Sequence, residues 1–190
     1  MAPYARMRAS LAALSLLFAA SCESPVDDDL IESLGPEVEG VDEGEFHRYG
    51  QPCLACHGGY GDGPEFSIAG TVFVTPAGVA PAQGARVTIS DAVGKKIELV
   101  SNCAGNFFVR RGEFDPVFPL RAEVVCVERD GTERRNVMGT RIHREGGCAG
   151  CHERGPATEA SPGQVYCVSF DADPSRYARD TNCRGGPSPQ

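Results

Sequence analysis

The residues best suited to chemistry lie in two short segments, residues 46–59 and residues 142–155. The first reads FHRYGQPCLACHGG and the second reads IHREGGCAGCHERG. Each contains an apolar residue, His-Arg, a short glycine-containing turn and then Cys-x-x-Cys-His. All four histidines of the chain belong to this repeat. Two thiols and an imidazole at this spacing suit a metal site, a redox dithiol or a covalently attached cofactor.

The histidine that closes each motif favours covalent haem attachment. Two thiols three positions apart can each add to a haem vinyl group, and the next imidazole then lies under the iron. In this pattern the chain resembles multihaem c-type cytochromes. The resemblance implies two covalently attached haems c. The residues that match are Cys53 and Cys56 with iron ligand His57, and Cys148 and Cys151 with iron ligand His152.

The upstream histidines, His47 and His143, are the candidates for the sixth iron ligands. Once an N-terminal signal is removed, Met138 is the only methionine left, so bis-histidine ligation at both haems is the favoured hypothesis. The alternatives are that both histidines are surface residues of a duplicated segment, or that Met138 binds one iron. The sequence does not pair either histidine with a particular haem. An open axial position would allow peroxidase or ligand-sensing chemistry.

A haem-free alternative uses the same four cysteines. Their paired spacing is also that of a Cys₄ zinc ribbon, and the pairs can form disulfides. Zinc gives the two closing histidines no role, and no β-α-β pattern supports a thioredoxin-like dithiol. The alternative function is therefore a surface binding or structural module without haem.

The N-terminus predicts export. Arg6 and Arg8 precede an apolar run, residues 11–20, that is too short to span a bilayer as a stable helix. Small residues then lead into Cys22, and residues 1–22 resemble a bacterial lipoprotein signal. The resemblance implies a chain lipid-anchored through Cys22 to a bacterial membrane of the cell envelope, facing the periplasm or the cell surface. An ordinary secretory signal is the alternative.

Charge is concentrated directly after this signal. Residues 23–45 carry ten carboxylates and no Lys or Arg, so they are expected to form a disordered acidic tether. Without residues 1–22 the chain has 16 basic and 26 acidic residues, a balance of −10. This balance argues against nucleic acid as a partner and favours a basic redox partner protein.

Between the two motifs the sequence predicts short strands with alternating apolar residues, separated by turns. The segments are residues 66–75, 84–90, 95–101, 105–111 and 119–128, with a last strand in residues 163–170. This pattern is typical of a mainly β protein, a β-sandwich with little helix, flanked by two irregular Cys-x-x-Cys-His segments. The expected organisation is residues 46–65 for the first motif segment, 66–128 for the sandwich and 129–190 for the second motif segment with a C-terminal strand and tail.

The sandwich region also resembles transthyretin-like, carboxypeptidase-regulatory-like domains. The residues that carry the resemblance are IAGTV (68–72), PAQGARVTI (81–89) and SNCAGNFFV (101–109). Such domains are generally non-catalytic, and no Ser/His/Asp set or paired carboxylates stand out in the chain. We therefore expect an electron carrier rather than an enzyme. The family has a polar or small residue at the position of Cys103, which suggests a disulfide there.

Apart from Cys22, four cysteines lie outside the two motifs and are expected to form disulfides in an oxidising compartment. They are Cys103, Cys126, Cys167 and Cys183. One arrangement joins Cys103 to Cys126 and Cys167 to Cys183, but the sequence does not choose among the three pairings.

Overall fold

The computed structural model describes residues 25–37, 39, 41, 43–59, 61, 63–168, 173–177 and 183. The chain divides into residues 1–34 and residues 35–190, and each part is described by itself. Within the described residues, every helix is too short or too polar to cross a membrane. The proposed signal and Cys22 lie outside the described residues.

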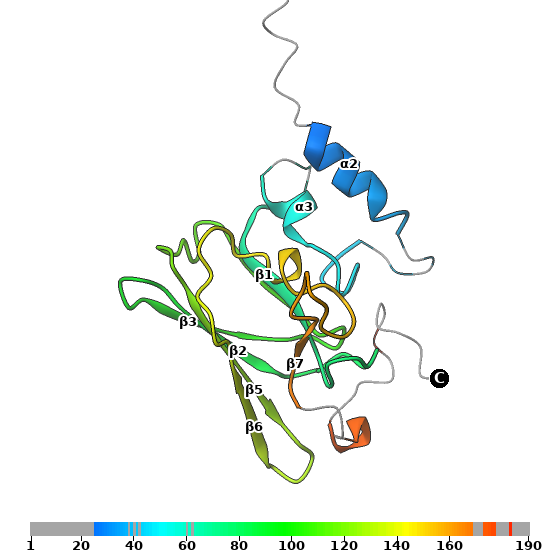
Figure 1. Ribbon diagram of the computed structural model, residues 1–190, viewed down its shortest axis with the longest axis vertical. Helices are drawn as coiled ribbons and strands as arrows, with labels where there is room; N and C mark the ends of the chain where they lie inside the picture. The colour runs from blue at the N-terminus through cyan, green and yellow to red at the C-terminus, as the bar shows by residue number, and fades with distance from the viewer. Residues whose placement is uncertain are drawn as a thin grey trace, which may run out of the picture. The chain divides into compact units, whose positions relative to one another are not determined.

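Residues 35–190 contain two sheets, whose strands pair antiparallel apart from one parallel pair (Figure 1). One sheet has the strand order β4-β1-β7 and the other has the order β3-β2-β5-β6. The strands are β1 (Phe66–Phe73), β2 (Arg86–Ser90), β3 (Lys96–Val100), β4 (Asn106–Arg110), β5 (Arg121–Val127), β6 (Glu133–Val137) and β7 (Val165–Tyr166). The mainly β prediction is confirmed.

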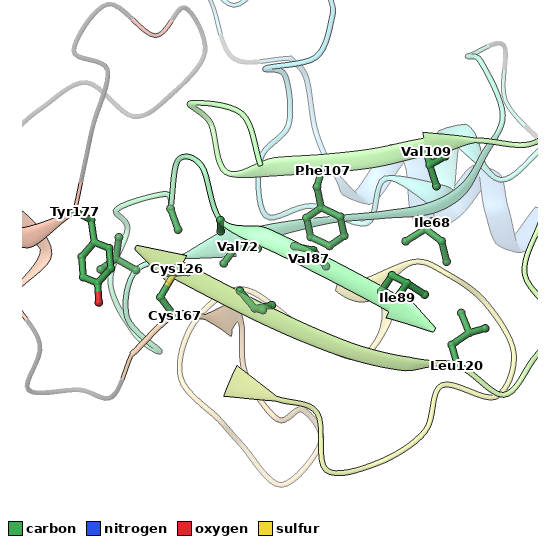
Figure 2. Packing of buried hydrophobic residues seen from close by; sticks show 14 of the residues in the cluster. Ile68, Val72, Val87, Ile89, Phe107, Val109, Leu120, Cys126, Cys167 and Tyr177 are labelled. Atoms are coloured by element: carbon green, nitrogen blue, oxygen red, sulfur yellow. A yellow bond between two sulfur atoms is a disulfide. The ribbon is translucent and has the colours of Figure 1, made fainter. Parts of the chain in front are cut away.

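A single hydrophobic core lies between the sheets, where Figure 2 shows side chains of β1 and β4 facing those of β2 and β5. The alternation of apolar residues explains the strands, because successive side chains point to opposite faces. Val87 and Ile89 of β2 are buried, for example, while Arg86, Thr88 and Ser90 are half-buried. Ile68 and Val72 contribute the same kind of face from β1. The strands predicted in residues 66–128 are all present.

The sandwich extends beyond the predicted boundary at residue 128. Strand β6 pairs with β5 and completes the four-stranded sheet. Its sequence, ERRNV, has almost no apolar alternation, which is why the strand was not predicted. The C-terminal strand was predicted, and β7 joins β1 in a parallel pair through Val72 and Val165.

The four cysteines that were expected to pair do form two disulfides, but the pairing that the sequence suggested is wrong. The bridges join Cys103 to Cys183 and Cys126 to Cys167. The reason is the position of β7, because its backbone continues along β1 and the Cys167 amide donates to the Phe73 carbonyl at 3.0 Å. Cys167 therefore lies opposite Cys126 of β5, and this bridge ties the two sheets together (Figure 2).

The acidic tether also differs in part from its prediction. Pro25–Ser33 forms helix α2, although residues 23–45 were expected to be disordered. Asp28 lies in the first turn of the helix, where negative charge interacts favourably with the helix dipole. Further along, Arg48 forms an ion pair with Glu37 at 2.6 Å and donates to the Gly35 carbonyl at 2.9 Å. These contacts order part of the predicted tether.

Candidate functional site

The two Cys-x-x-Cys-His motifs adopt closely similar turns. Cys53 caps helix α3 (Leu54–His57), which contains the rest of the first motif, and the 3-10 helix η1 (Cys148–Gly150) begins the second. The His57 amide donates to the Cys53 carbonyl at 2.9 Å, and the His152 amide donates to the Cys148 carbonyl at 2.8 Å. Each turn therefore holds the first cysteine and the histidine in one compact unit, as the shared sequence pattern predicts.

Both closing histidines have their ring orientation fixed in the same way. Nδ1 of His57 is 2.9 Å from the Pro64 carbonyl oxygen, and Nδ1 of His152 is 2.8 Å from the Gly163 carbonyl oxygen. A carbonyl only accepts hydrogen bonds, so Nδ1 must be the protonated nitrogen in both rings. In the neutral ring, Nε2 then carries the free lone pair, and this is the tautomer that a metal-ligating histidine requires.

The Gly163 carbonyl belongs to a well-anchored loop. Gln164 is buried, and its side-chain amide donates to the carbonyls of Thr75 at 2.7 Å and Gly78 at 2.8 Å. Its side-chain oxygen accepts from the Gly155 amide at 3.1 Å. Gln164 therefore fixes the position of the carbonyl that orients His152.

Strand β1 supports the second motif. The Ala69 amide donates to the Gly146 carbonyl at 3.1 Å, so the residues before Cys148 run along the edge of β1. The Cys148 side chain then packs on Gly70. A Cβ atom at position 70 would lie 2.8 Å from Cβ of Cys148 and 2.8 Å from Cζ of Phe107. The absence of a side chain at Gly70 is what allows this close approach.

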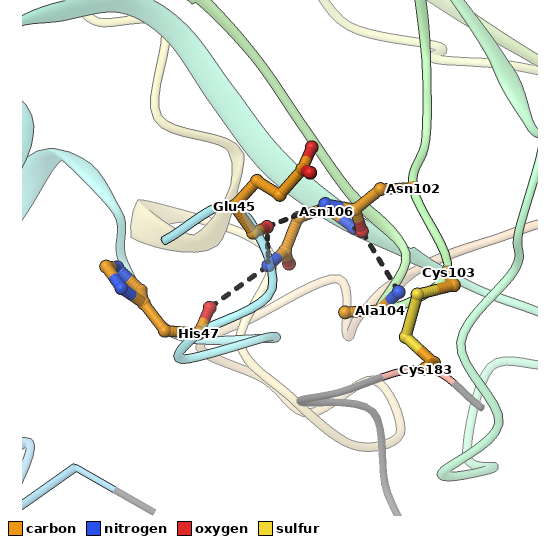
Figure 3. The surroundings of a disulfide bond; sticks show 7 residues. All are labelled: Glu45, His47, Asn102, Cys103, Ala104, Asn106 and Cys183. Carbon is orange, nitrogen blue, oxygen red and sulfur yellow. Dashed lines mark hydrogen bonds between the residues drawn. A yellow bond between two sulfur atoms is a disulfide. The ribbon is translucent and has the colours of Figure 1, made fainter. Parts of the chain in front are cut away.

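The first motif is anchored to the same sheet through polar side chains (Figure 3). The Asn106 side-chain amide donates to the His47 carbonyl at 3.0 Å and the Glu45 carbonyl at 3.2 Å, and the Asn102 amide also donates to Glu45. The Asn106 oxygen accepts from the Thr71 hydroxyl, to which the Gly50 amide donates at 2.8 Å. The segment preceding Cys53 is thus attached to β4 and β1.

The two motifs lie next to each other, although about 90 residues separate them in sequence. A Cβ atom at Gly147 would be 3.2 Å from the Leu54 side chain, between the two cysteines of the first motif. The Arg154 guanidinium lies 5.0 Å from the centre of the Tyr49 ring. The fold therefore brings the repeated segments together at one side of β1.

The four motif cysteines are free thiols, whereas the other described cysteines are paired. Burial raises the pKa of the Cys53 thiol to about 11. The neighbouring Cys56 raises this pKa further, whereas a backbone hydrogen bond lowers it. Burial likewise raises the pKa of Cys148 to about 12, with further increases from the neighbouring thiols and Glu145. Cys151, in contrast, is exposed. Cys53 and Cys148 are therefore neutral thiols at physiological pH.

The upstream histidines occupy different environments. The His47 ring centre is 5.9 Å from that of His57, with 21° between the ring planes. The Gly44 amide donates to Nδ1 of His47 at 3.1 Å, which places the proton of the neutral ring on Nε2. That exposed bond contributes about 1 kcal/mol, a small obstacle to rotation of the ring. His143 is exposed, and its neighbour Ile142 pairs with Leu120 beside β5.

Aromatic rings continue from His57 into the sheet. The His57 ring stacks on Phe66 with centres 4.4 Å apart, and Phe66 stacks on Phe108 at 4.7 Å. Gly63 lies against the edge of the ring, since a Cβ there would be 2.6 Å from Nδ1 of His57. The ring is consequently positioned by packing as well as by its hydrogen bond.

Met138 lies away from β1. Its amide donates to the Ala122 carbonyl of β5 at 3.1 Å, in the opposite sheet. For metal sites more generally, no group of three or more His, Cys, Asp or Glu side chains among the described residues is placed to hold an ion.

Comparisons of the chain with protein-family models, curated proteins and solved structures find no match. The family resemblances suggested by the sequence therefore remain proposals. The residues that position the histidines were not anticipated, because Pro64 and Gly163 act through backbone carbonyls, which carry no side-chain signal. Gln164 and Asn106 are common polar residue types, and their roles depend on contacts between distant segments.

Proposed function

We propose that this protein is an exported di-haem c-type electron carrier. One observation carries the proposal, namely that both closing histidines have Nδ1 on a backbone carbonyl and so present Nε2 as a metal ligand. Two independent segments with the same motif, the same turn and the same tautomer are difficult to explain by a structural role alone. The motif cysteines are also free, as thioether formation requires.

The residues of the chain have separate roles in this proposal. Cys53 and Cys56 attach one haem and the corresponding cysteines of the second motif attach the other, while His57 and His152 are the proximal ligands. Haem c, when bound, supplies an iron that alternates between the ferric and ferrous states. The carbonyl hydrogen bonds keep both imidazoles in the ligating tautomer and increase their basicity. His47 is the candidate sixth ligand at the first site.

The location and the partner also remain proposals. We place the protein in the bacterial cell envelope, lipid-anchored through Cys22, with its sandwich as the scaffold for both haems. Residues 46–190 contain 16 basic and 16 acidic residues, so the negative charge of the exported chain comes from residues 23–45. This acidic segment favours electrostatic attraction of a basic redox partner, and such attraction weakens as salt increases.

Haem staining of denatured protein tests the proposal. The full chain is produced in a host that performs cytochrome maturation, boiled in denaturant and separated on a gel, where covalent haem remains on the band. The C53A/C56A variant should retain one haem per chain. The matched control C103A/C183A removes two cysteines outside the motifs and should retain two. A colourless wild-type band would refute the proposal.

A haem-free metal or disulfide module is the second candidate. The proximity of the two motifs supports it, because Gly147, directly before Cys148, packs against the Leu54 side chain of the first motif. In that case the purified chain would contain zinc in proportion to protein, or intramotif disulfides, and no haem. Elemental analysis and thiol counting on the same sample distinguish these outcomes.

A further inference from the structure

We propose that the outer edge of strand β3 is an interface through which two copies of this chain pair antiparallel and join their sheets. The proposal concerns the sandwich and does not depend on haem at either motif. Strand β3 is the first strand in the order β3-β2-β5-β6, so a neighbouring strand occupies only one of its two edges. The other edge is the surface in question.

The hydrogen bonds around β3 show which of its backbone groups point towards β2. At one end, the Ser101 amide donates to the Ala85 carbonyl at 2.9 Å. At the other end, the Asp91 amide donates to the Lys95 carbonyl at 2.9 Å. Hydrogen-bonded pairs alternate along an antiparallel ladder, so every second residue between these ends also bonds β2. Those residues of β3 are Ile97 and Leu99.

The remaining residues of β3 direct their backbone groups away from β2. The amides and carbonyls of Lys96, Glu98 and Val100 therefore line the outer edge. Among the described residues, no other strand pairs with this edge. Such a row of hydrogen-bonding groups is a template for a further strand.

The edge at β3 also lacks the protection found at the opposite edge of the same sheet. At β6, Arg134 and Arg135 form ion pairs with glutamates of the chain, each 2.7 Å long. Strand β3 has no proline, and its register with β2 is unbroken over five residues. Its two charged residues, Lys96 and Glu98, form no ion pair with any other described residue. Both are exposed.

These two charges favour one register for pairing with a second copy. Lys96 and Glu98 lie on the same face of the sheet, because side chains two residues apart do so. A two-fold axis through Ile97 places Lys96 of each copy opposite Glu98 of the other, which gives two attractive pairs. The same register brings their outward amides and carbonyls together as hydrogen-bonded pairs. An axis through Glu98 would instead oppose two carboxylates, which is unfavourable.

Pairing also covers apolar surface. Ile97 and Leu99 pack against the hydrophobic core but are only half-buried, because β3 lies at the edge. A second strand beside them completes their burial. An interface made by one five-residue strand is smaller than the ~1,000 Å² of a stable complex, so we expect a weak dimer in solution. The proposed lipid anchor would confine the chains to one layer and increase dimer formation through their effective concentration.

Disulfide trapping of the full, membrane-anchored chain tests the interface. Ile97→Cys places a thiol on the proposed axis, where facing Cα atoms are ~4.5 Å apart, within the range of a disulfide. Val100→Cys is the matched control, because Val100 is 61% exposed. It lies three residues from the axis, and at ~3.4 Å per residue the two copies of this position are about 20 Å apart.

Oxidation by oxygen with copper phenanthroline should give several-fold more covalent dimer from Ile97→Cys than from Val100→Cys. Random collisions would instead favour the more exposed position. Equal yields, a higher yield from Val100→Cys, or no dimer from either variant would overturn the proposal.

Charge variants test the register without changing a core residue. The dimer dissociation constant is measured in detergent by sedimentation equilibrium at concentrations up to about 1 mM. Lys96→Glu and Glu98→Lys each oppose like charges and should raise this constant at least about tenfold. The combined variant K96E/E98K restores both attractive pairs and should return it to within about threefold of the wild type. A monomeric wild type at every concentration, or no recovery in the combined variant, would overturn the proposal.

Haem content is not a readout of either experiment. A haem-free chain that still dimerises through β3 would refute the proposed function alone. A chain with two haems and no dimer would refute this inference alone.

Discussion

Replacing Gly70 by alanine should disturb the seat of the second motif. The new Cβ would lie 2.8 Å from Cβ and 3.0 Å from Sγ of Cys148, and 2.8 Å from the Phe107 ring. Overpacking of this kind costs about 1–3 kcal/mol. Alanine restricts the unfolded chain and returns about 0.4–1 kcal/mol. The net expectation is a loss of about 1–2 kcal/mol in the free energy of unfolding, or ~2–8 °C in melting temperature.

The matched control is Gly139→Ala, since no atom lies within 4 Å of a Cβ at that position. This variant gains the same unfolded-state restriction without a clash, so its stability should stay within about 1 kcal/mol of the wild type or increase. Urea unfolding of both variants measures the difference. Gly70→Ala should also reduce haem attachment at Cys148 more than at Cys53. Equal stability of the two alanine variants would refute the packing of Cys148 on β1.

Three further perturbations test other parts of the structure. Replacing Cys126 and Cys167 by alanine removes a disulfide that joins residues 41 positions apart. Urea unfolding should then show a loss of about 4 kcal/mol in the free energy of unfolding. An unchanged urea midpoint would contradict the disulfide between the sheets. Gln164→Leu removes the donor from the buried Thr75 carbonyl and from the partly buried Gly78 carbonyl. It should cost about 2 kcal/mol of stability, with a shift in the reduction potential of the second haem only. In the haem-free chain, the thiol pKa is raised to about 11 at Cys53 and to about 12 at Cys148. Above pH 9 the folded state therefore keeps thiol protons that the unfolded state loses. Their contribution to stability is thus complete below pH 9 and declines towards pH 12, and a melting temperature independent of pH over this range would disagree.

The strands were predictable where one face is buried and the other is not. Strand β2 illustrates this, because its buried apolar residues Val87 and Ile89 alternate with polar residues in the sequence. Strand β6 was not predicted because it lies at the edge of its sheet and buries few apolar side chains. Its Arg135 instead forms an ion pair with Glu123 of β5. Edge strands need little apolar surface, so periodicity does not identify them.

Long-range relations were the least predictable features. The disulfide partners follow from the parallel addition of β7 to β1, which brings Cys167 to Cys126 and which no local pattern specifies. In the candidate site, motif spacing identified His57 and His152 but not the carbonyls that set their tautomers. The difference between His47 and His143 depends on turns and strand pairing outside the repeat, so two similar segments predicted two similar sites.

The intact mass of the mature chain, purified after cytochrome maturation, tests the central claim most directly. The account predicts a mass increase of two haems, with all four motif thiols consumed and unreactive towards alkylating reagents after denaturation. A chain of unmodified polypeptide mass, with Cys53, Cys56, Cys148 and Cys151 all available for alkylation, would contradict it.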